Sequence, residues 1–278
     1  MTMKIILLTC IWERKNLTEL FLKYLSWTQQ KLNDKLIISV VVVGSNPEDE
    51  ELVVNKYDFT YLNHINQPLS EKWQAGLDHI ADCNYDALLI LGSDDFLALD
   101  IFDCYIDFLK NSNSLAFGFS DCYFLDLIER KWVYWPGYGK TLKDRQPHRM
   151  GEPIGAGRLI KREAMLSIAH NLWRGSMLNK GLDKYAYDIL SSITLSDAAK
   201  VIWEIKSLRQ LNRMMIDVKV GQSVTKYKAF QIEQNDEYSL EYYIYNKMRE
   251  NFPSFVVSDI LDLRASLRHQ HVRGDLIG

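Results

Sequence analysis

Two adjacent carboxylates, Asp94 and Asp95, follow a short apolar run and have the residue types and spacing for metal and phosphate chemistry. Residues 87–91 are all apolar, which predicts a central strand covered on both faces. Open α/β sheets bind ligands at the carboxyl ends of their strands. Two like charges side by side need a cation or hydrogen-bond donors, so the pair indicates a divalent-cation site that also holds phosphate oxygens. The alternative is that one of them caps a helix beginning near Leu97.

The composition limits the classes of protein to which the chain can belong. It has 278 residues, 47% of them hydrophobic, enough for one large domain or a domain with an appendage. A net charge of -3 argues against a general nucleic-acid binder. The four cysteines lack disulfide or zinc spacing, which predicts a reduced, cytoplasmic protein. No apolar stretch reaches membrane-spanning length, and a peripheral membrane contact of the basic C-terminal end, with Arg264, Arg268 and Arg273, is left open.

The elements that position the acidic pair alternate between strands and helices. Apolar, β-branched runs predict strands, and helical spacing of apolar residues predicts the segments between them. The strands are expected at residues 4–10, 36–43, 59–62 and 87–91, with helices over 16–27 and 70–80 and an acidic helix start at 48–51. This alternation predicts an α/β fold, a Rossmann-like and mostly parallel sheet with helices on both faces.

The second half of the chain is expected to add a hairpin and further strands and helices to the fold. Residues 122–127 and 131–135 predict a hairpin, and a long loop with five basic side chains between residues 140 and 149 is typical of a functional segment. A strand at 115–119, helices over 161–172 and 182–195 and a strand at 198–205 complete this part, and two polar helices follow near 238–249 and 260–268. We expect one domain over 1–205, with halves of about 1–110 and 111–205, and a C-terminal extension, 206–278, packed on the same domain.

Two segments carry a family resemblance. Residues 91–95 read Leu-Gly-Ser-Asp-Asp, and residues 66–77 read Asn-Gln-Pro-Leu-Ser-Glu-Lys-Trp-Gln-Ala-Gly-Leu. Their order and spacing resemble a nucleotide-sugar-dependent glycosyltransferase of the GT-A fold and are most similar to the inverting family 2, over about residues 4–190. Two departures stand out: the family often has Asp where this chain has Gly92, and an acidic residue that reads the base where it has Ser45-Asn46. The identity of the base is therefore open.

The resemblance implies roles for particular residues. Asp95 is the expected main ligand of Mn²⁺ or Mg²⁺, with Asp94 and His148 assisting. Asp183, near the start of its predicted helix, is the expected general base, and Asp188 is the reserve. Acceptor contacts are expected from Trp135 and Tyr138, and donor contacts from Thr9, Cys10, Arg14, Ser45, Asn66, Lys72, Asp94 and Arg158.

Each of these roles has a simpler alternative. The simpler explanation is a surface lysine for Lys72, core aromatics for Trp135 and Tyr138, and a helix cap for Asp183. For Arg158 and His148 it is a structural role.

The resemblance implies a nucleoside-diphosphate sugar and a glycan acceptor as partners. It also implies that the half over about 1–110 binds the nucleotide and the half over about 111–205 binds the acceptor. A sugar nucleotidyltransferase would carry a glycine-rich phosphate loop after the first strand, and residues 9–15 contain no glycine. A non-catalytic nucleotide- or carbohydrate-binding protein on the same fold remains a second hypothesis. Release of nucleotide from a sugar donor would separate the two.

Overall fold

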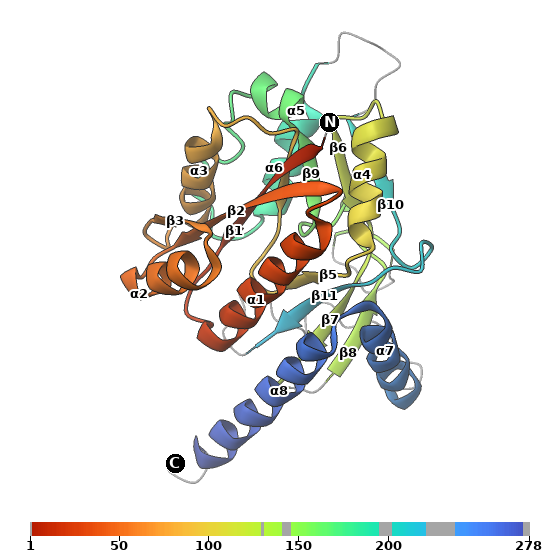
Figure 1. Cartoon of the computed structure of the whole chain (residues 1–278). Coiled ribbons are helices and arrows are strands. Elements are labelled where there is room, and N and C mark those ends of the chain that lie inside the picture. The colour runs from red at the N-terminus through yellow and green to blue at the C-terminus, as the bar shows by residue number, and fades with distance from the viewer. Residues whose placement is uncertain (1, 129–130, 141–145, 195–201, 221–236, 275–278) are drawn as a thin grey trace.

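A seven-stranded sheet forms the centre of the molecule (Figure 1). The structure, a computed structural model, describes residues 2–128, 131–140, 146–194, 202–220 and 237–274. The strands lie in the order β10 (Trp203–Lys206), β6 (Ala116–Phe119), β9 (Arg158–Lys161), β4 (Ala87–Ile90), β1 (Met3–Cys10), β2 (Leu36–Gly44) and β3 (Thr60–Asn63). All described neighbours pair in parallel except β9, which runs antiparallel to β4 and β6. The predicted α/β class with a mostly parallel sheet is confirmed.

Both faces of this sheet are buried, because apolar side chains occupy successive positions of the central strands. In β1, Ile5 and Leu7 belong to one core, and Ile6 and Leu8 belong to the other. Successive side chains of a strand point to opposite faces, so an uninterrupted apolar run requires cover on both sides. The helices supply that cover.

The helices divide between the two faces. On one face lie α1 (Lys15–Leu32) and α4 (Ile101–Asn111), which pack on the core that contains Leu7. On the other lie α3 (Leu69–Ile80), α5 (Arg162–Ser167) and α6 (Leu182–Ser191), which share the core of Leu8. Between β2 and β3, the short helix α2 (Pro47–Glu50) continues directly into a π-helix, η1 (Glu51–Lys56).

A second sheet of four strands adjoins the first and confirms the predicted hairpin. It has the order β5 (Asp95–Leu97), β11 (Met215–Lys219), β7 (Cys122–Asp126) and β8 (Lys131–Trp135), and β7 and β8 pair antiparallel. Because β11 lies between β5 and β7, the predicted C-terminal extension contributes a strand to the interior of this sheet.

The sequence analysis did not predict three of the described strands. β5 and β11 were not predicted, and β9 occupies residues expected to be loop and helix start. The predicted helix start near Leu97 was wrong, because Asp95 belongs to β5 and α4 begins at Ile101. The capping alternative for the acidic pair is therefore excluded. The helix predicted over 161–172 is shorter, since only Arg162–Ser167 is helical.

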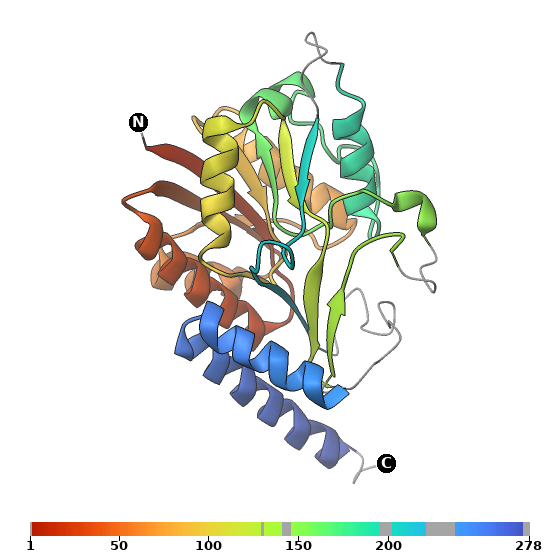
Figure 2. The same cartoon turned by 90° about the vertical axis from the view of Figure 1, so that its right-hand side faces the viewer.

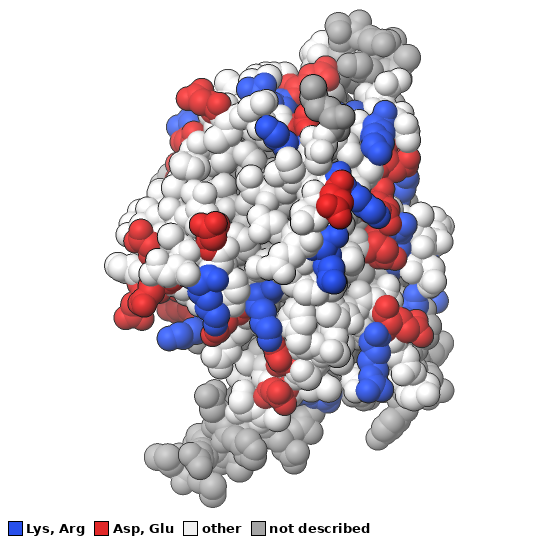
Figure 3. Space-filling view, viewed as in Figure 1, with Lys and Arg blue, Asp and Glu red and all other residues white. Residues whose placement is uncertain are grey.

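Two C-terminal helices cover the lower end of the molecule. They are α7 (Glu237–Asn251), which contacts β8, and α8 (Ser254–Gly274), which runs beside α1 (Figure 2). None of the described helices is both long and apolar enough to cross a membrane. On the face drawn in Figure 3, basic and acidic side chains are interspersed and form no continuous basic track.

Candidate functional site

Three carboxylates from two distant parts of the chain meet beyond the carboxyl ends of β1 and β4. Asp94 and Asp95 follow β4, and Asp217 comes from β11, where it lies opposite Asp95 in the strand pairing. Each offers an oxygen, and these oxygens all lie within 4.8 Å of one another. The sheet edge is the location expected for ligand binding in this fold class.

Two cations already face this cluster. The Arg14 Nη1 donates to Asp94 Oδ2 at 2.6 Å, and its Nη2 donates to Ser93 Oγ at 2.9 Å. The Lys219 Nζ lies 2.6 Å from Asp217 Oδ2 and 3.6 Å from Asp94 Oδ2. With all groups ionised, three negative charges face two positive ones. One negative charge of the cluster is therefore left without an internal partner.

The pKa values of the three acids separate accordingly. Burial opposes ionisation of Asp94, but Arg14 and Lys219 outweigh burial and hold its pKa below the ordinary value. Burial and the adjacent charges of Asp217 and Asp94 raise the pKa of Asp95 well above its ordinary range. Burial likewise raises the pKa of Asp217 to about 6, although Lys219 acts in the opposite direction. Such divergence among close acids is typical of functional sites.

The cluster fits a divalent cation. Its ligands are carboxylate oxygens, which hard cations prefer. In addition, the Asp217 Oδ1 is buried and has no hydrogen-bond partner among the described residues. An unpaired buried polar atom is costly, so an oxygen left free in this position indicates a ligand that would pair with it.

The sequence prediction for this cluster was incomplete. Asp94 and Asp95 are brought together as expected, whereas His148 lies exposed in the short 3₁₀ helix η2 (Pro147–Arg149), outside the carboxylate cluster. Asp217 takes the third place instead and was missed. The sequence feature that could have found Asp217 is the alternation of apolar and charged residues within 214–220. This alternation predicts a strand with Asp217 and Lys219 on the same side.

Gly92 explains one departure from the family pattern. Its backbone N–H donates to Asp95 Oδ2 at 3.0 Å. A Cβ at this position would lie 2.6 Å from the same oxygen, closer than side-chain contacts allow. An aspartate therefore cannot replace Gly92 while Asp95 keeps this orientation.

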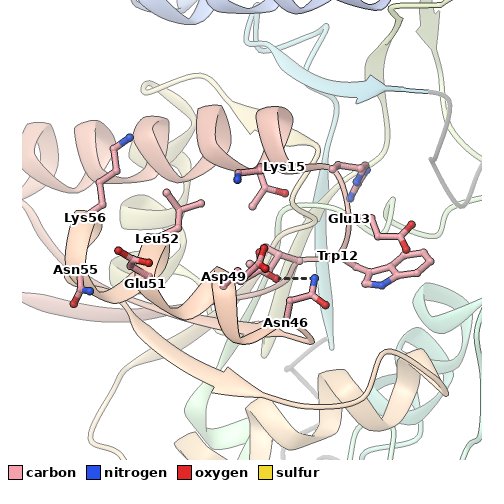
Figure 4. A pocket seen from close by; sticks show the side chains of 13 residues that line it. Trp12, Glu13, Lys15, Asn46, Asp49, Glu51, Leu52, Asn55 and Lys56 are labelled. Atoms are coloured by element: carbon pink, nitrogen blue, oxygen red, sulfur yellow. Dashed lines mark hydrogen bonds between the residues drawn. The ribbon is translucent and has the colours of Figure 1, made fainter. Parts of the chain in front are cut away.

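A cavity of about 660 Å³ opens between the start of α1 and the α2–η1 segment, and none of the three carboxylates lines it. Trp12 and Glu13 lie at one end of it and Asn55 and Lys56 at the other (Figure 4). Arg14 lines the cavity and also binds Asp94, so it connects the cavity with the carboxylates. The volume is of the size expected for a small-molecule site.

Lys72 is the centre of the predicted donor-binding residues, but it is fully buried. Its Nζ donates to the Ile11 carbonyl at 2.7 Å, to Ser45 Oγ at 2.7 Å and to Asn66 Oδ1 at 3.1 Å. These acceptors belong to the loops after β1, β2 and β3, so Lys72 ties three loops of the sheet edge together. An ammonium group has three protons, and all three are engaged here. The surface-lysine alternative was wrong. A direct donor contact of Lys72 stays a prediction.

The remaining residues predicted to contact the donor include Thr9, Cys10 and Arg158, of which Thr9 and Arg158 are buried. Thr9 is fully buried with no partner for its Oγ1 among the described residues, and Cys10 ends β1. Arg158 is 1% exposed and donates to the carbonyls of Ile154, Pro153 and Asp183. Every nitrogen of its guanidinium is therefore bound to backbone, which is a structural arrangement.

Asp183 lies at the same edge of the sheet as the acidic cluster. A Cβ on Gly155 would lie 3.0 Å from the Asp183 Cβ. Gly155 lies three residues before the start of β9, where Arg158 pairs with Ile90, the last residue of β4. The segments around Asp183 and Asp94 thus both lie beyond the carboxyl end of β4. Asp188, the reserve base, is exposed and pairs with Lys184.

Among the predicted acceptor residues, Trp135 is 8% exposed and packs on Phe124 and Tyr138. Tyr138 donates from its hydroxyl to Asp183. Arg149, one of the basic residues of the long loop, also binds Asp183, and no role was predicted for it.

No family model matches the chain, and no curated protein matches it. Among solved structures, S. aureus TarS 1–349 is similar at 13% identity, covering 93% of this chain and 71% of that one, with a TM-score of 0.45. The same S. aureus protein in complex with UDP-GlcNAc is similar at 13% identity, covering 97% and 73%, with a TM-score of 0.49. Similarities at this level carry no argument about activity. The fold class of this chain therefore rests on its own sheet order and helix layers.

Proposed function

We propose that this protein transfers a glycosyl group, with inversion, from a nucleoside-diphosphate sugar to a hydroxyl group of a glycan acceptor and requires a divalent cation. The observation that carries the proposal is the meeting of Asp94, Asp95 and Asp217 at the carboxyl edge of the sheet, where Arg14 binds Asp94 and lines a cavity. The sequence resemblance of residues 66–77 and 91–95 supports the same class of reaction.

The formal charge of the carboxylate cluster supports the requirement for a divalent cation. With every group ionised, the three carboxylates together with Arg14 and Lys219 have a formal charge of -1. A diphosphate placed beside it would add negative charge to a site that is already negative, and this is costly where groups are buried. When bound, Mn²⁺ or Mg²⁺ would neutralise charge on the leaving diphosphate. Asp94, Asp95 and Asp217 are the residues that would hold it.

The chain's own groups supply the other parts of the reaction. Arg14 lines the cavity, and its guanidinium would bind a phosphate oxygen of the donor. Asp183 accepts the proton of the acceptor hydroxyl, whose oxygen forms the bond to the anomeric carbon. The bond from that carbon to the diphosphate breaks, and nucleoside diphosphate leaves. Proton removal by a positioned base typically contributes about 100- to 10,000-fold in rate.

Titration calorimetry with nucleoside diphosphates, with and without Mn²⁺, tests the donor site. We expect binding that needs the cation and is weakened at least tenfold by Asp95→Asn, because the substitution removes a charged oxygen ligand. Asp34→Asn, an exposed acid outside the site, is the matched control. Metal-independent binding by Asp95→Asn at wild-type affinity would contradict the proposal.

Release of nucleoside diphosphate from a panel of sugar donors tests catalysis. Turnover supports the transferase. Tight, cation-dependent binding of the intact donor without any release would favour the non-catalytic binding protein instead.

A further inference from the structure

The carboxylate of Asp183 is held on one side only. The Tyr138 hydroxyl donates to Asp183 Oδ2 at 2.5 Å, and Arg149 Nη2 donates to the same oxygen at 2.7 Å. No described residue hydrogen-bonds the other oxygen, Oδ1, and 24% of the side chain is exposed. One oxygen is therefore fixed, and the other is open to an incoming group.

Tyr138 and Arg149, which bind Asp183, are themselves fixed by further contacts. Arg149 is 6% exposed, and its Nε donates to Glu152 Oε2 at 2.7 Å. Its guanidinium lies over the Tyr138 ring, 3.5 Å from the ring centre. Arg158 fixes the backbone of Asp183 through its carbonyl at 2.6 Å. Side chains locked by such outer contacts keep a functional group within a narrow range of orientations.

We propose that Tyr138 and Arg149 are positioning residues that hold Asp183 Oδ2 and thereby aim Oδ1 at the acceptor hydroxyl. The inference rests on the proposed function, in which Asp183 is the general base. It gives Tyr138 a role other than the predicted stacking on an acceptor sugar. One face of its ring is covered by Arg149, and the Trp135 ring meets it edge-to-face at 4.8 Å and 90°.

The groups facing Asp183 determine how its charge responds to pH. Tyr138, Arg149 and Arg158 face Asp183 from the neighbouring segments. Glu152 pairs with Arg149 and offsets part of its charge. Lys184, the next residue of α6, lies near Glu152. Burial opposes ionisation, but the two arginines and the tyrosine hold the pKa of Asp183 below its ordinary value. Removing either holding group must therefore raise the pKa of this carboxyl.

The test compares Tyr138→Phe, Arg149→Gln and Asp183→Asn with the wild type in donor turnover, measured as a function of pH. We expect the acid limb of kcat to move to higher pH in Tyr138→Phe and further, by about one to three pH units, in Arg149→Gln. We also expect kcat at neutral pH to fall about tenfold or more, with the KM for donor changed less than about twofold, because orientation of the base affects only the transition state.

Tyr134→Phe is the matched control. Its hydroxyl donates to Asp121 Oδ2 at 2.7 Å, so the substitution removes a similar tyrosine–carboxylate hydrogen bond without touching Asp183. We expect its acid limb to stay at the wild-type pH. Urea unfolding of all variants shows whether a loss of kcat reflects loss of the fold.

The outcomes separate the two proposals. If Asp183→Asn loses turnover while Tyr138→Phe and Arg149→Gln, folded, keep the wild-type acid limb and kcat, the positioning role is overturned and the base survives. If Asp183→Asn keeps full turnover, or if the wild type turns over no donor, the base itself is wrong, and the positioning role falls with it.

Discussion

Asp217→Asn should act in opposite directions on stability and on cation binding. The pKa of Asp217 is raised to about 6 from 3.8. At neutral pH, ionisation of Asp217 is therefore less favourable in the folded state than in the unfolded state, and this lowers the free energy of unfolding. The gap of about two pH units corresponds to about 3 kcal/mol, at about 1.4 kcal/mol per unit. The side chain is only 15% exposed, so solvent screening reduces this value little.

The sign follows from the order in which the two states ionise. Below about pH 4, Asp217 is protonated in both states and contributes nothing. As the pH rises from about 4 to 6, the unfolded state ionises first, so the folded state loses stability. Asparagine keeps the shape, cannot ionise and can still accept a bond from Lys219. The variant should therefore escape this loss.

Urea unfolding with a chelator present, at pH 4 and pH 7, measures the effect. We expect the free energy of unfolding of Asp217→Asn to exceed that of the wild type by about 3 kcal/mol at pH 7 and by little at pH 4. Calorimetry should show at least tenfold weaker Mn²⁺ binding. A variant less stable than the wild type at pH 7 would refute the reasoning, because the attraction between Asp217 and Lys219 would then outweigh burial and like-charge repulsion.

Three further substitutions test particular contacts. Gly92→Ala places a Cβ against Asp95 Oδ2 and should lower the free energy of unfolding by about 1–3 kcal/mol; an unchanged urea midpoint would contradict this contact. Lys72→Met removes the three hydrogen bonds of the Lys72 ammonium group and also a buried charge, and it should lower the free energy of unfolding by about 2–4 kcal/mol in the same assay. A smaller loss would argue against the role of Lys72 in holding the three loops together. His148→Ala should leave Mn²⁺ affinity unchanged in calorimetry, because the side chain lies outside the carboxylate cluster; a tenfold loss would restore it as a ligand.

The sequence determined most of the central sheet and two of the three carboxylates of the acidic cluster. β1, β2 and β4 each contain a run of at least four consecutive apolar residues, which indicated burial on both faces, and helical spacing located α1 and α3. The position of Asp94 and Asp95 at a strand end followed from the same local pattern. Local patterns suffice for these elements because the periodicity of apolar residues decides which faces are buried.

Only the tertiary structure decided the rest of the site. β5, β9 and β11 are three to five residues long, and each is a strand because of the partners it pairs with, which a short window of sequence does not contain. Asp217 therefore joined the cluster only when β11 paired with β5. Arg149 and Asp183 are 34 residues apart and meet through packing of η2 on α6. The charge balance of the site and the orientation of Asp183 depend on such distant contacts, so the sequence alone could not supply them.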